Sequence, residues 1–587
     1  MTKRLFSKLA CGALAIAMTL AGAAGFAGCN RTGTTPGGID QEVDPTRTQL
    51  YVANHDGGFS YEWLQAAAAR FEELYKDVPF EEGKTGVQIM FDRTGGIGSQ
   101  IMAKIPLSRN AVYFTESVYY YDYLNAQNGA VFADITDIVS GEDSDLSEFG
   151  DTGTIEDKLT DQQKKFYQTD DRKYYGIPHY QAFQGIIYDK DFFEQDMLYF
   201  SDNENNGNGG FITSPTEKRS PGKDGIYCET CAANGYDYSD HYCDDGLPAT
   251  YDEFARLLEY IADSGETPMV WSGQVHQNYL DKFMSSLAAD YEGLDDFMLN
   301  YTFDGTAHHL VQSIDANTGK VTLRAATPIK PDNGYEMYTS AGRYYAMEFM
   351  QEAVSDSRYY YYLSFNGTHS HTNAQDDFLR SKDRSSRIAM LIDGSYWENE
   401  ADDTFEYMSN NNVNDPDSRY SRKFGFMPLP KPTEEDGTKN TLFDFLYSLG
   451  FINANIEDDP VLFPLAKKFL KFVNTEQSLR EFTVITGSPK ALEYDLTEDD
   501  LSQMSFYGRS LWNLKANSDV VYPYSTGAIF LNNQSDFVFA NSFADSGVSD
   551  VSKTLRDGAS TPLQLFNNIG NTKSQAAWNS NYSNYFS

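Results

Sequence analysis

The sequence predicts an α/β protein with more than one domain. Residues 48–54 form a short β-prone run, and a segment beginning at Ser60 follows with apolar side chains at helical spacing. Two further apolar runs lie at 86–92 and 111–115. Strands that alternate with helices are typical of α/β proteins and predict largely parallel sheets. The 587-residue chain is also too long for one ordinary hydrophobic core, so we expect two or three domains or lobes.

The alternation continues through the rest of the chain. We expect an apolar series at 175–189, a helix at 249–264, strands at 268–272, 387–393 and 423–428, and an amphipathic helix pair at 461–486. The sequence shows no internal repeat and no sustained heptad pattern.

The N-terminal segment has the pattern of a secretory leader over residues 1–28. Lys3, Arg4 and Lys8 are followed by an uncharged run at 9–28, and small residues lie directly before Cys29. This end of the segment resembles the lipobox of bacterial lipoproteins, which implies that Cys29 is lipidated. The alternative is an uncleaved membrane anchor, which the Gly- and Ala-rich composition favours less. Either arrangement places the protein on the extracellular face of the cell membrane.

Residues 29–47 are predicted to be a flexible linker, because a Thr-, Gly- and Pro-rich segment has no apolar face to bury. A polar insertion at 201–245 is expected to form an inserted loop. It holds Cys228, Cys231 and Cys243, whose state the sequence leaves open between a disulfide, a zinc site and free thiols. Calcium is a further possibility in this acidic loop, and no metal enters the predicted function.

The chain is strongly acidic and rich in aromatic residues. It has 46 Lys and Arg against 85 Asp and Glu, a formal net charge of −39, which argues against nucleic acid and anionic lipid headgroups as partners. The 41 Tyr, 39 Phe and 5 Trp exceed what a core needs, so some are expected to line a ligand site. No Gly-rich dinucleotide fingerprint or phosphate loop is present, and we expect no organic cofactor.

Six segments together resemble the extracellular solute-binding proteins (family 1) of bacterial ABC sugar importers, the class typified by maltose-binding protein. The segments occur in that family's order at 54–58, 62–64, 176–178, 185–190, 389–400 and 426–430. The resemblance implies a two-lobed periplasmic-binding-protein-like fold of the maltose-binding-protein type, with an interlobe cleft and multiple chain crossings. It places lobe 1 at 48–178 plus 429–487 and lobe 2 at 179–428 plus 488–587, with crossings near Tyr180 and Met427.

The resemblance also implies a function. The protein is expected to be a monomer that captures a carbohydrate, a neutral oligosaccharide, in the cleft and delivers it to the transmembrane subunits of an ABC permease. It is not expected to be an enzyme.

Sugars present hydroxyls that bond carboxylates and amides, and C–H faces that pack on aromatic rings. Side chains of these types lie at predicted strand ends or lobe crossings. The predicted ligand-binding residues are Asn54, Asp56, Glu116, Tyr119, Tyr180, Gln181, Trp271, Gln274, Tyr396, Trp397, Glu398 and Trp512. The resemblance places Tyr396 and Trp397 at a sugar-stacking position, and we expect one of these two rings to lie in the core. Trp512 has a core role as its alternative, and the turn at Asn54 has helix capping as its alternative.

Two other functions remain open from the sequence. A secreted glycoside hydrolase would need two carboxyl groups across one bond, for which Glu116 and Glu398 are the candidates. A surface adhesin or peptide-binding lipoprotein would share the leader but lack paired aromatics at strand ends.

Overall fold

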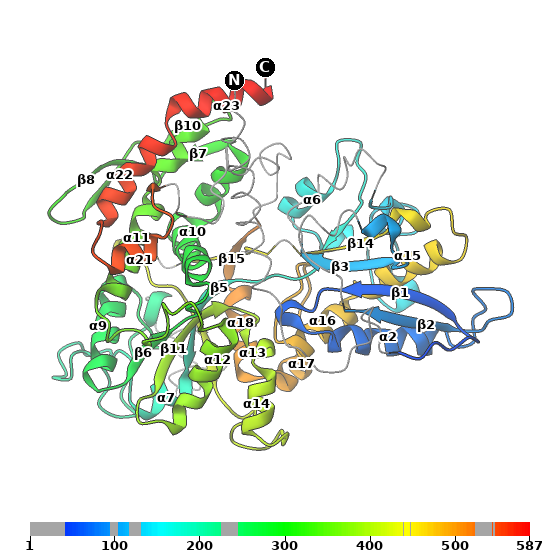
Figure 1. Ribbon diagram of the computed structural model, residues 1–587, viewed down its shortest axis with the longest axis horizontal. Coiled ribbons are helices and arrows are strands. Elements are labelled where there is room, and N and C mark those ends of the chain that lie inside the picture. Colours follow the sequence, from blue (N-terminus) through cyan, green and yellow to red (C-terminus); the bar gives the residue numbers. More distant parts are fainter. Residues whose placement is uncertain are drawn as a thin grey trace, which may run out of the picture.

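The protein has two main β-sheets in two separate lobes (Figure 1). The structure is a computed structural model and describes residues 41–93, 104–116, 131–224, 245–437, 439–446, 448–522, 543 and 546–586. Several sequence predictions lie outside these residues, namely the leader at 1–28, the lipidation site Cys29, Tyr119, and Cys228, Cys231 and Cys243. None of the helices in the described ranges combines the length and the apolar character that crossing a membrane requires.

The first lobe is built on a five-stranded sheet. Its strands, in spatial order, are β2 (Val87–Asp92), β1 (Thr48–Asn54), β3 (Val112–Glu116), β14 (Ser448–Ile452) and β4 (Ile177–Pro178). Helices α2 (Glu62–Leu74), α15 (Leu462–Phe472) and α16 (Glu476–Thr486) belong to this lobe, with α16 packed on α2 and α15 on β1 and β14. The predicted strands at 48–54, 86–92 and 111–115 and the predicted helix pair are confirmed.

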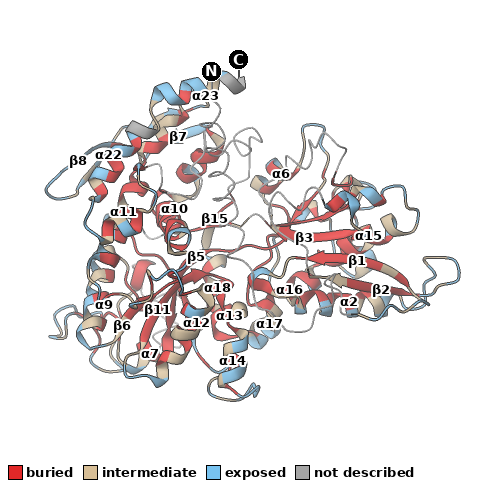
Figure 2. Cartoon of the chain, in the orientation of Figure 1, coloured by how far each residue is buried: buried red, intermediate tan, exposed pale blue. Residues whose placement is uncertain are grey.

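The second lobe is built on a four-stranded sheet and carries most of the helices. Its strands, in spatial order, are β12 (Phe424–Met427), β5 (Gln184–Asp189), β11 (Ile388–Gly394) and β6 (Thr267–Val270). The longest described helix, α10 (His276–Thr302), packs on α11 (Ala341–Ser355) and changes direction at Gly293, where φ is 76°. Both sheets are buried by the elements around them (Figure 2).

Further helices and short strands lie outside the two main sheets. The other helices are α5 (Thr136–Val139), α6 (Asp161–Tyr167), α7 (Lys190–Gln195), α9 (Tyr251–Asp263), α12 (His371–Arg380), α13 (Trp397–Glu400), α14 (Asp402–Met408), α17 (Glu498–Gln503), α18 (Phe506–Ala516), α21 (Val551–Arg556), α22 (Pro562–Thr572) and α23 (Gln575–Phe586). The short strands are β7 (Gly305–Ala307), β8 (Val311–Ile314), β9 (Val321–Leu323), β10 (Thr327–Ile329), β13 (Asn440–Phe443) and β15 (Ser518–Val521). The C-terminal helices pack on the second lobe, with α21 and α22 against α11.

The prediction of largely parallel sheets is wrong, because both sheets are mixed. β14 runs antiparallel to β3, and β5 runs antiparallel to both β11 and β12. The reason is that β14 and β5 enter their sheets from the other lobe. Ser448 at the start of β14 lies opposite Glu116 at the end of β3, and Gln184 at the start of β5 lies opposite Gly394 at the end of β11.

Within the described ranges, three chain segments cross between the lobes side by side. An isolated bridge joins Tyr180 to Lys490, and another joins Phe183 to Asp444. The backbone N–H of Gln181 donates to the Pro489 carbonyl oxygen at 3.1 Å. These hydrogen bonds satisfy backbone groups that are buried at the junction, so the three segments form one connected hinge.

The second crossing comes later in the chain than the expected one near Met427. β12 ends at Met427 within the four-stranded sheet, and the chain then forms β13, which pairs with β15 and packs on α10. It reaches the first lobe only at β14. The described part of the expected loop at 201–245 also contacts the second lobe, where Phe211 stacks on Tyr260 of α9 with ring centroids 4.2 Å apart.

The lobes also contact each other directly, through the 3-10 helix η1 (Gly57–Phe59) of the first and α13 of the second. A Cβ atom built on Gly58 would lie 2.3 Å from the ring of Tyr396. The neighbouring Phe59 packs against Tyr396 with ring centroids 5.6 Å apart and stacks on Tyr180 at 3.9 Å. A side chain at Gly58 is therefore incompatible with the present distance between the lobes.

We predict that Gly58→Ala opens the two lobes, because its methyl group would overlap the Tyr396 ring. Small-angle scattering of the unliganded protein should show a larger radius of gyration than wild type. Gly367→Ala is the matched control, since a Cβ atom there meets no atom within 4 Å. An unchanged radius for Gly58→Ala would mean that this contact does not set the interlobe distance.

Candidate functional site

The candidate site is a cluster of polar and aromatic side chains where the two lobes meet. We call it the interlobe cluster, and it consists of His55, Glu116, Tyr180, Tyr279, Lys282, His371, Gln375, Asp393, Tyr396 and Glu400. The first lobe supplies the turn after β1 and the end of β3, the hinge supplies Tyr180, and the second lobe supplies α10, α12, the end of β11 and α13.

Glu116 is the carboxylate that the first lobe contributes. It is the last residue of β3, and it accepts a hydrogen bond of 2.5 Å from the Tyr180 hydroxyl. The His55 ring nitrogen Nε2 lies 3.9 Å from its other oxygen. Burial, with the nearby Glu116 charge, raises the pKa of Tyr180 well above its usual value, so the phenol stays protonated as a donor.

Asp393 and Glu400 form a carboxyl pair in the second lobe. The amide Nε2 of Gln375 donates to Asp393 Oδ2 at 3.0 Å and to Glu400 Oε2 at 2.8 Å. The Gly394 amide donates to Asp393 Oδ1 at 2.7 Å. Burial raises the pKa of each carboxyl to about 7, and for Asp393 the nearby Glu400 charge adds to the effect.

Two tyrosines and a lysine complete the second-lobe side. Tyr279 and Lys282 lie one turn apart on α10, and the phenol groups of Tyr279 and Tyr396 interact. Burial lowers the pKa of Lys282 to about 8 despite the opposing effect of Glu116 and Asp393. His371 Nε2 lies 3.9 Å from Glu400 Oε1. The cluster thus combines carboxyl, phenol, amide, imidazole and ammonium groups on both sides of one junction.

Of the residues predicted from the sequence, Glu116, Tyr180 and Tyr396 lie in this cluster. Asn54 and Asp56 lie beside it and hold the turn after β1. The Asn54 amide donates to Asp56 Oδ1 at 3.1 Å and to the Ser60 carbonyl at 3.3 Å, and the Arg93 guanidinium pairs with Asp56 at 2.5 Å.

Trp397 and Glu398 do not face the junction, although both were predicted to bind ligand. Trp397 is fully buried in the second lobe, against Phe424 and Tyr507, and presents no ring face to a ligand. Glu398 is also buried; it pairs with Arg419 at 2.9 Å and accepts a hydrogen bond from Ser505. These contacts give both residues a structural role, because α13 directs positions 396 and 400 toward the cluster and 397 and 398 away from it.

The other predicted residues lie elsewhere. Trp271 is fully buried against Tyr360 and Phe365, and Gln274 is exposed on the following turn. Gln181 is buried within the hinge. Trp512 is 8% exposed and packs against Tyr494, away from the cluster.

Sequence reasoning missed His55 of the first lobe and most of the second-lobe side, namely Tyr279, Lys282, His371, Gln375, Asp393 and Glu400. Two signals were present: Asp393 ends the most apolar strand of the second half, and Glu400 lies four residues after Tyr396, on the same side of a helical turn. The structure places no three or more His, Cys, Asp or Glu in a metal-holding arrangement within its described ranges.

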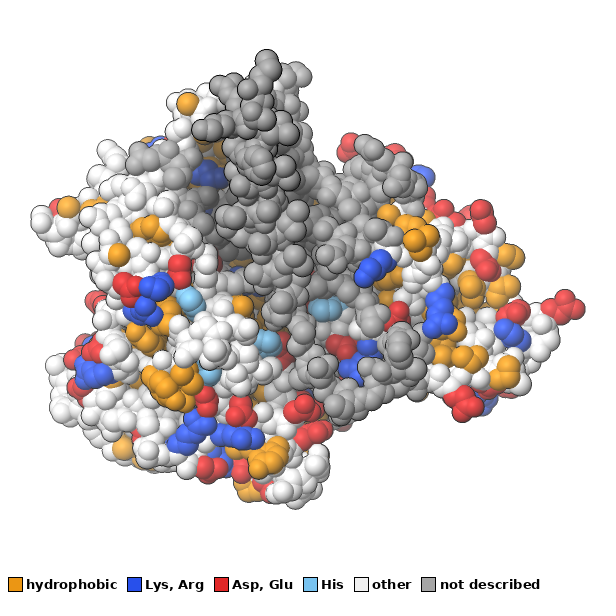
Figure 3. Space-filling view, viewed as in Figure 1, with side chains coloured by type: hydrophobic (Ala, Val, Ile, Leu, Met, Phe, Trp, Pro, Cys, Tyr) orange, Lys and Arg blue, Asp and Glu red, His pale blue; other side chains and the backbone are white. Residues whose placement is uncertain are grey.

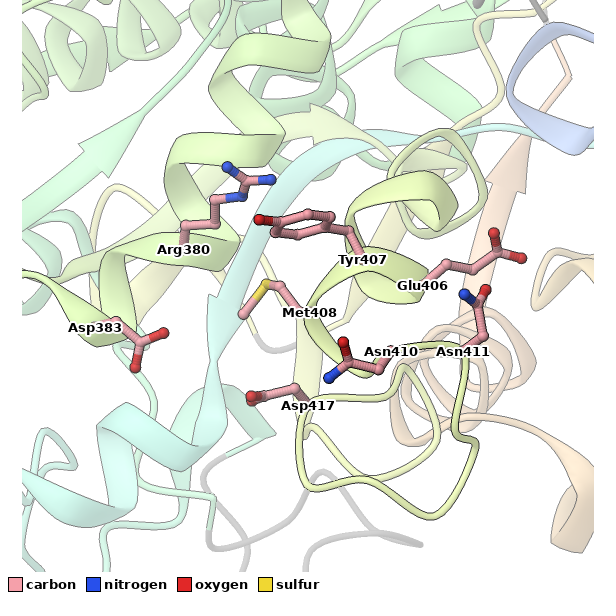
Figure 4. Close-up of a pocket in the computed structure, with 8 residues that line it drawn as sticks. All are labelled: Arg380, Asp383, Glu406, Tyr407, Met408, Asn410, Asn411 and Asp417. Atoms are coloured by element: carbon pink, nitrogen blue, oxygen red, sulfur yellow. The ribbon is translucent and has the colours of Figure 1, made fainter.

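A separate pocket of about 600 Å³ lies on the second lobe alone (Figure 4). Its lining residues are Arg380, Asp383, Glu406, Tyr407, Met408, Asn410, Asn411 and Asp417. The Arg380 guanidinium lies 4.7 Å from the centre of the Tyr407 ring. We do not place the functional site here, because the pocket contains none of the predicted residues and no group from the first lobe.

Comparisons with known proteins give similarities only among solved structures. No protein-family model matches the sequence, and no curated protein matches it. Similar structures include the SBP RafE in complex with raffinose (12% identity, 91% of this chain and 99% of that one, TM-score 0.49). Two others are maltose-bound T. maritima MalE3 (13% identity, TM-score 0.47) and a probable secreted solute-binding lipoprotein from Streptomyces coelicolor (12% identity, TM-score 0.48). Each match covers 90% of this chain and 99% of the other chain. At these identities and scores, the similarities assign no function by themselves.

We predict that Trp397→Ala lowers the free energy of unfolding by about 3–5 kcal/mol, the range for removing a buried large aromatic side chain. Tyr396→Phe is the comparison variant, because it keeps the ring against Gly58 and removes only the hydroxyl, at a cost of about 1 kcal/mol. Urea denaturation measures both. A Trp397→Ala protein of wild-type stability would contradict the core position of this ring.

The raised pKa values of Asp393 and Glu400 predict a pH-dependent stability. A carboxyl whose pKa is higher in the folded than in the unfolded state stabilises the fold at low pH, and this contribution is lost as the pH rises through about 7. Asp393→Asn removes one such group. Its Tm relative to wild type should therefore rise between about pH 5 and about pH 8. A Tm difference that is constant across this range would contradict the assignment.

Proposed function

We propose that this chain is the substrate-binding protein of an ABC importer, held on the outer face of the membrane through Cys29. It captures a carbohydrate between its lobes and delivers it to a membrane permease. The observation that carries the proposal is the interlobe cluster, in which Glu116 of one lobe faces Asp393, Tyr396 and Glu400 of the other across a three-segment hinge. The order of the six sequence segments supports the same family.

The cluster has the chemistry that a sugar requires. Its carboxyl oxygens accept hydrogen bonds from hydroxyls, and the Gln375 amide and the phenols offer both donors and acceptors. Tyr396 is buried against Gly58 and Phe59 of the other lobe, so its ring becomes available to a sugar C–H face when the lobes separate. A ligand that contacts both lobes favours the closed arrangement by its differential contacts, and the hinge gives closure an axis.

Binding without chemistry is the function that the carboxyl positions support. The pair considered for glycoside hydrolysis, Glu116 and Glu398, does not form one site, because Glu398 is buried in its ion pair with Arg419. Asp393 and Glu400 have the raised pKa values that a general acid also needs. The experiment therefore has to follow the fate of the sugar as well as its binding.

We predict that a thermal-shift screen over neutral and amino oligosaccharides identifies a ligand that raises Tm and is recovered intact. At a ligand concentration of 100 times Kd the stabilisation is about 2.7 kcal/mol. Chromatography of the incubated sugar measures its fate. Shorter products would convert the assignment to a glycoside hydrolase, and a screen in which no saccharide raises Tm would overturn carbohydrate binding.

A further inference from the structure

The interlobe cluster differs in what neutralises it from three other buried carboxylates, Asp189, Asp290 and Glu398, whereas Glu292 and Asp444 are buried without an ion pair among the described residues. Asp189 pairs with both Arg387, at 2.8 Å, and Arg422, at 2.9 Å. Asp290 likewise pairs with two lysines, and Glu398 pairs with Arg419. These structural carboxylates have a permanent cation within hydrogen-bond distance, as a buried charge requires.

The three cluster carboxyls have no such partner. Among the described residues, no Lys or Arg nitrogen lies within 4 Å of Glu116, Asp393 or Glu400. Lys282 interacts electrostatically with Glu116 and Asp393, but its ammonium nitrogen lies over the Phe445 ring, 4.2 Å from the centroid, and His371 also acts on Asp393. Asp56 is not part of this imbalance, because Arg93 pairs with it.

The charged and titratable groups that face the three carboxyls come from each element packed around them. They are His55 from the turn after β1, Tyr180 from the hinge, Tyr279 and Lys282 from α10, His371 from α12 and Tyr396 from the start of α13. Three carboxyls therefore meet one lysine, and the two imidazoles are each 3.9 Å from a carboxylate oxygen. The junction lacks positive charge.

An unpartnered acceptor lies in the same place. Gln375 is 1% exposed, and its amide nitrogen bonds both Asp393 and Glu400. Its amide oxygen Oε1 is buried and has no hydrogen-bond partner within the described structure. A buried acceptor without a donor is costly, so the cluster lacks hydrogen-bond donors as well as positive charge.

We propose that the ligand is a saccharide carrying a protonated primary amine, rather than the wholly neutral oligosaccharide expected from the sequence. An ammonium group supplies one positive charge and three donors, which match the Asp393 and Glu400 carboxylates and the Gln375 oxygen. Glu116 adds negative charge from the other lobe, so the amine also draws the lobes together. This inference rests on the proposed function and specifies the substrate class of the same site.

The test is calorimetry at neutral pH with three oligosaccharide series of equal length and linkage that differ only at C2. The series carry an amine (glucosamine), an acetamide (N-acetylglucosamine) or a hydroxyl (glucose). We expect the amine series to bind about tenfold more tightly than the hydroxyl series, because a hydrogen bond between charged groups is stronger than a neutral one. Titration in two buffers of different ionisation enthalpy measures the number of protons exchanged on binding. We expect binding of the amine series to displace protons from the Asp393 and Glu400 carboxyls.

Substitutions that remove a carboxyl charge test whether the preference for the amine series arises at the interlobe cluster. Asp393→Asn and Glu400→Gln should each reduce the preference of the protein for the amine series. The control is Asp403→Asn, which removes the same charge from an exposed position on α14. Circular dichroism checks that each variant is folded, and the two site variants test the same point independently.

The outcomes separate this inference from the proposed function. Equal or tighter binding of the hydroxyl or acetamide series would overturn the proposal of an amine-bearing ligand and leave carbohydrate binding in place. An amine preference that survives in both site variants would overturn the assignment to this cluster. If no saccharide of any series binds, both the inference and the proposed function fail.

Discussion

The hydrogen-bonded hinge is the constraint on which the rest of this structure depends. Three segments far apart in the sequence cross between the lobes, and their buried backbone groups are satisfied by one another. Beside them, the Lys490 ammonium group contacts the His179 ring at 2.5 Å within a set of aromatic rings. Burial lowers the pKa of both side chains well below their usual values, so this contact stabilises the hinge without a buried ion pair.

The hinge explains why the site has the composition it has. It fixes the ends of β3 and β11 on opposite sides of one junction. Glu116 is the last residue of β3, and Asp393 is the last but one of β11. Over the face shown in Figure 3, acidic and basic side chains are interspersed on both lobes. The shortage of cations at the cluster follows from its own contacts, because the net charge of −39 describes the whole chain and not this junction.

The sequence allowed much of the fold to be predicted, but only part of the site. Strands such as β1 and β11 and helices such as α9 have clear periodicity, and strand ends indicated Glu116. The expected stacking pair at 396 and 397 includes one ring in the cluster and one in the core, because the short helix α13 turns adjacent residues to opposite sides. Residues of α10 were missed because their contribution depends on how this helix packs across the second sheet, which no local pattern encodes. The mixed sheets were missed for a related reason: the direction of a strand depends on the lobe from which it arrives.

The two ends of the described chain belong to different lobes. β1 begins the first lobe, and α21 to α23 pack on the second (Figure 1). A rotation about the hinge therefore changes the separation between the start and the end of the folded chain. A pair of optical labels, one before Thr48 and one on α23, would follow single closing events in real time while leaving the interlobe cluster untouched.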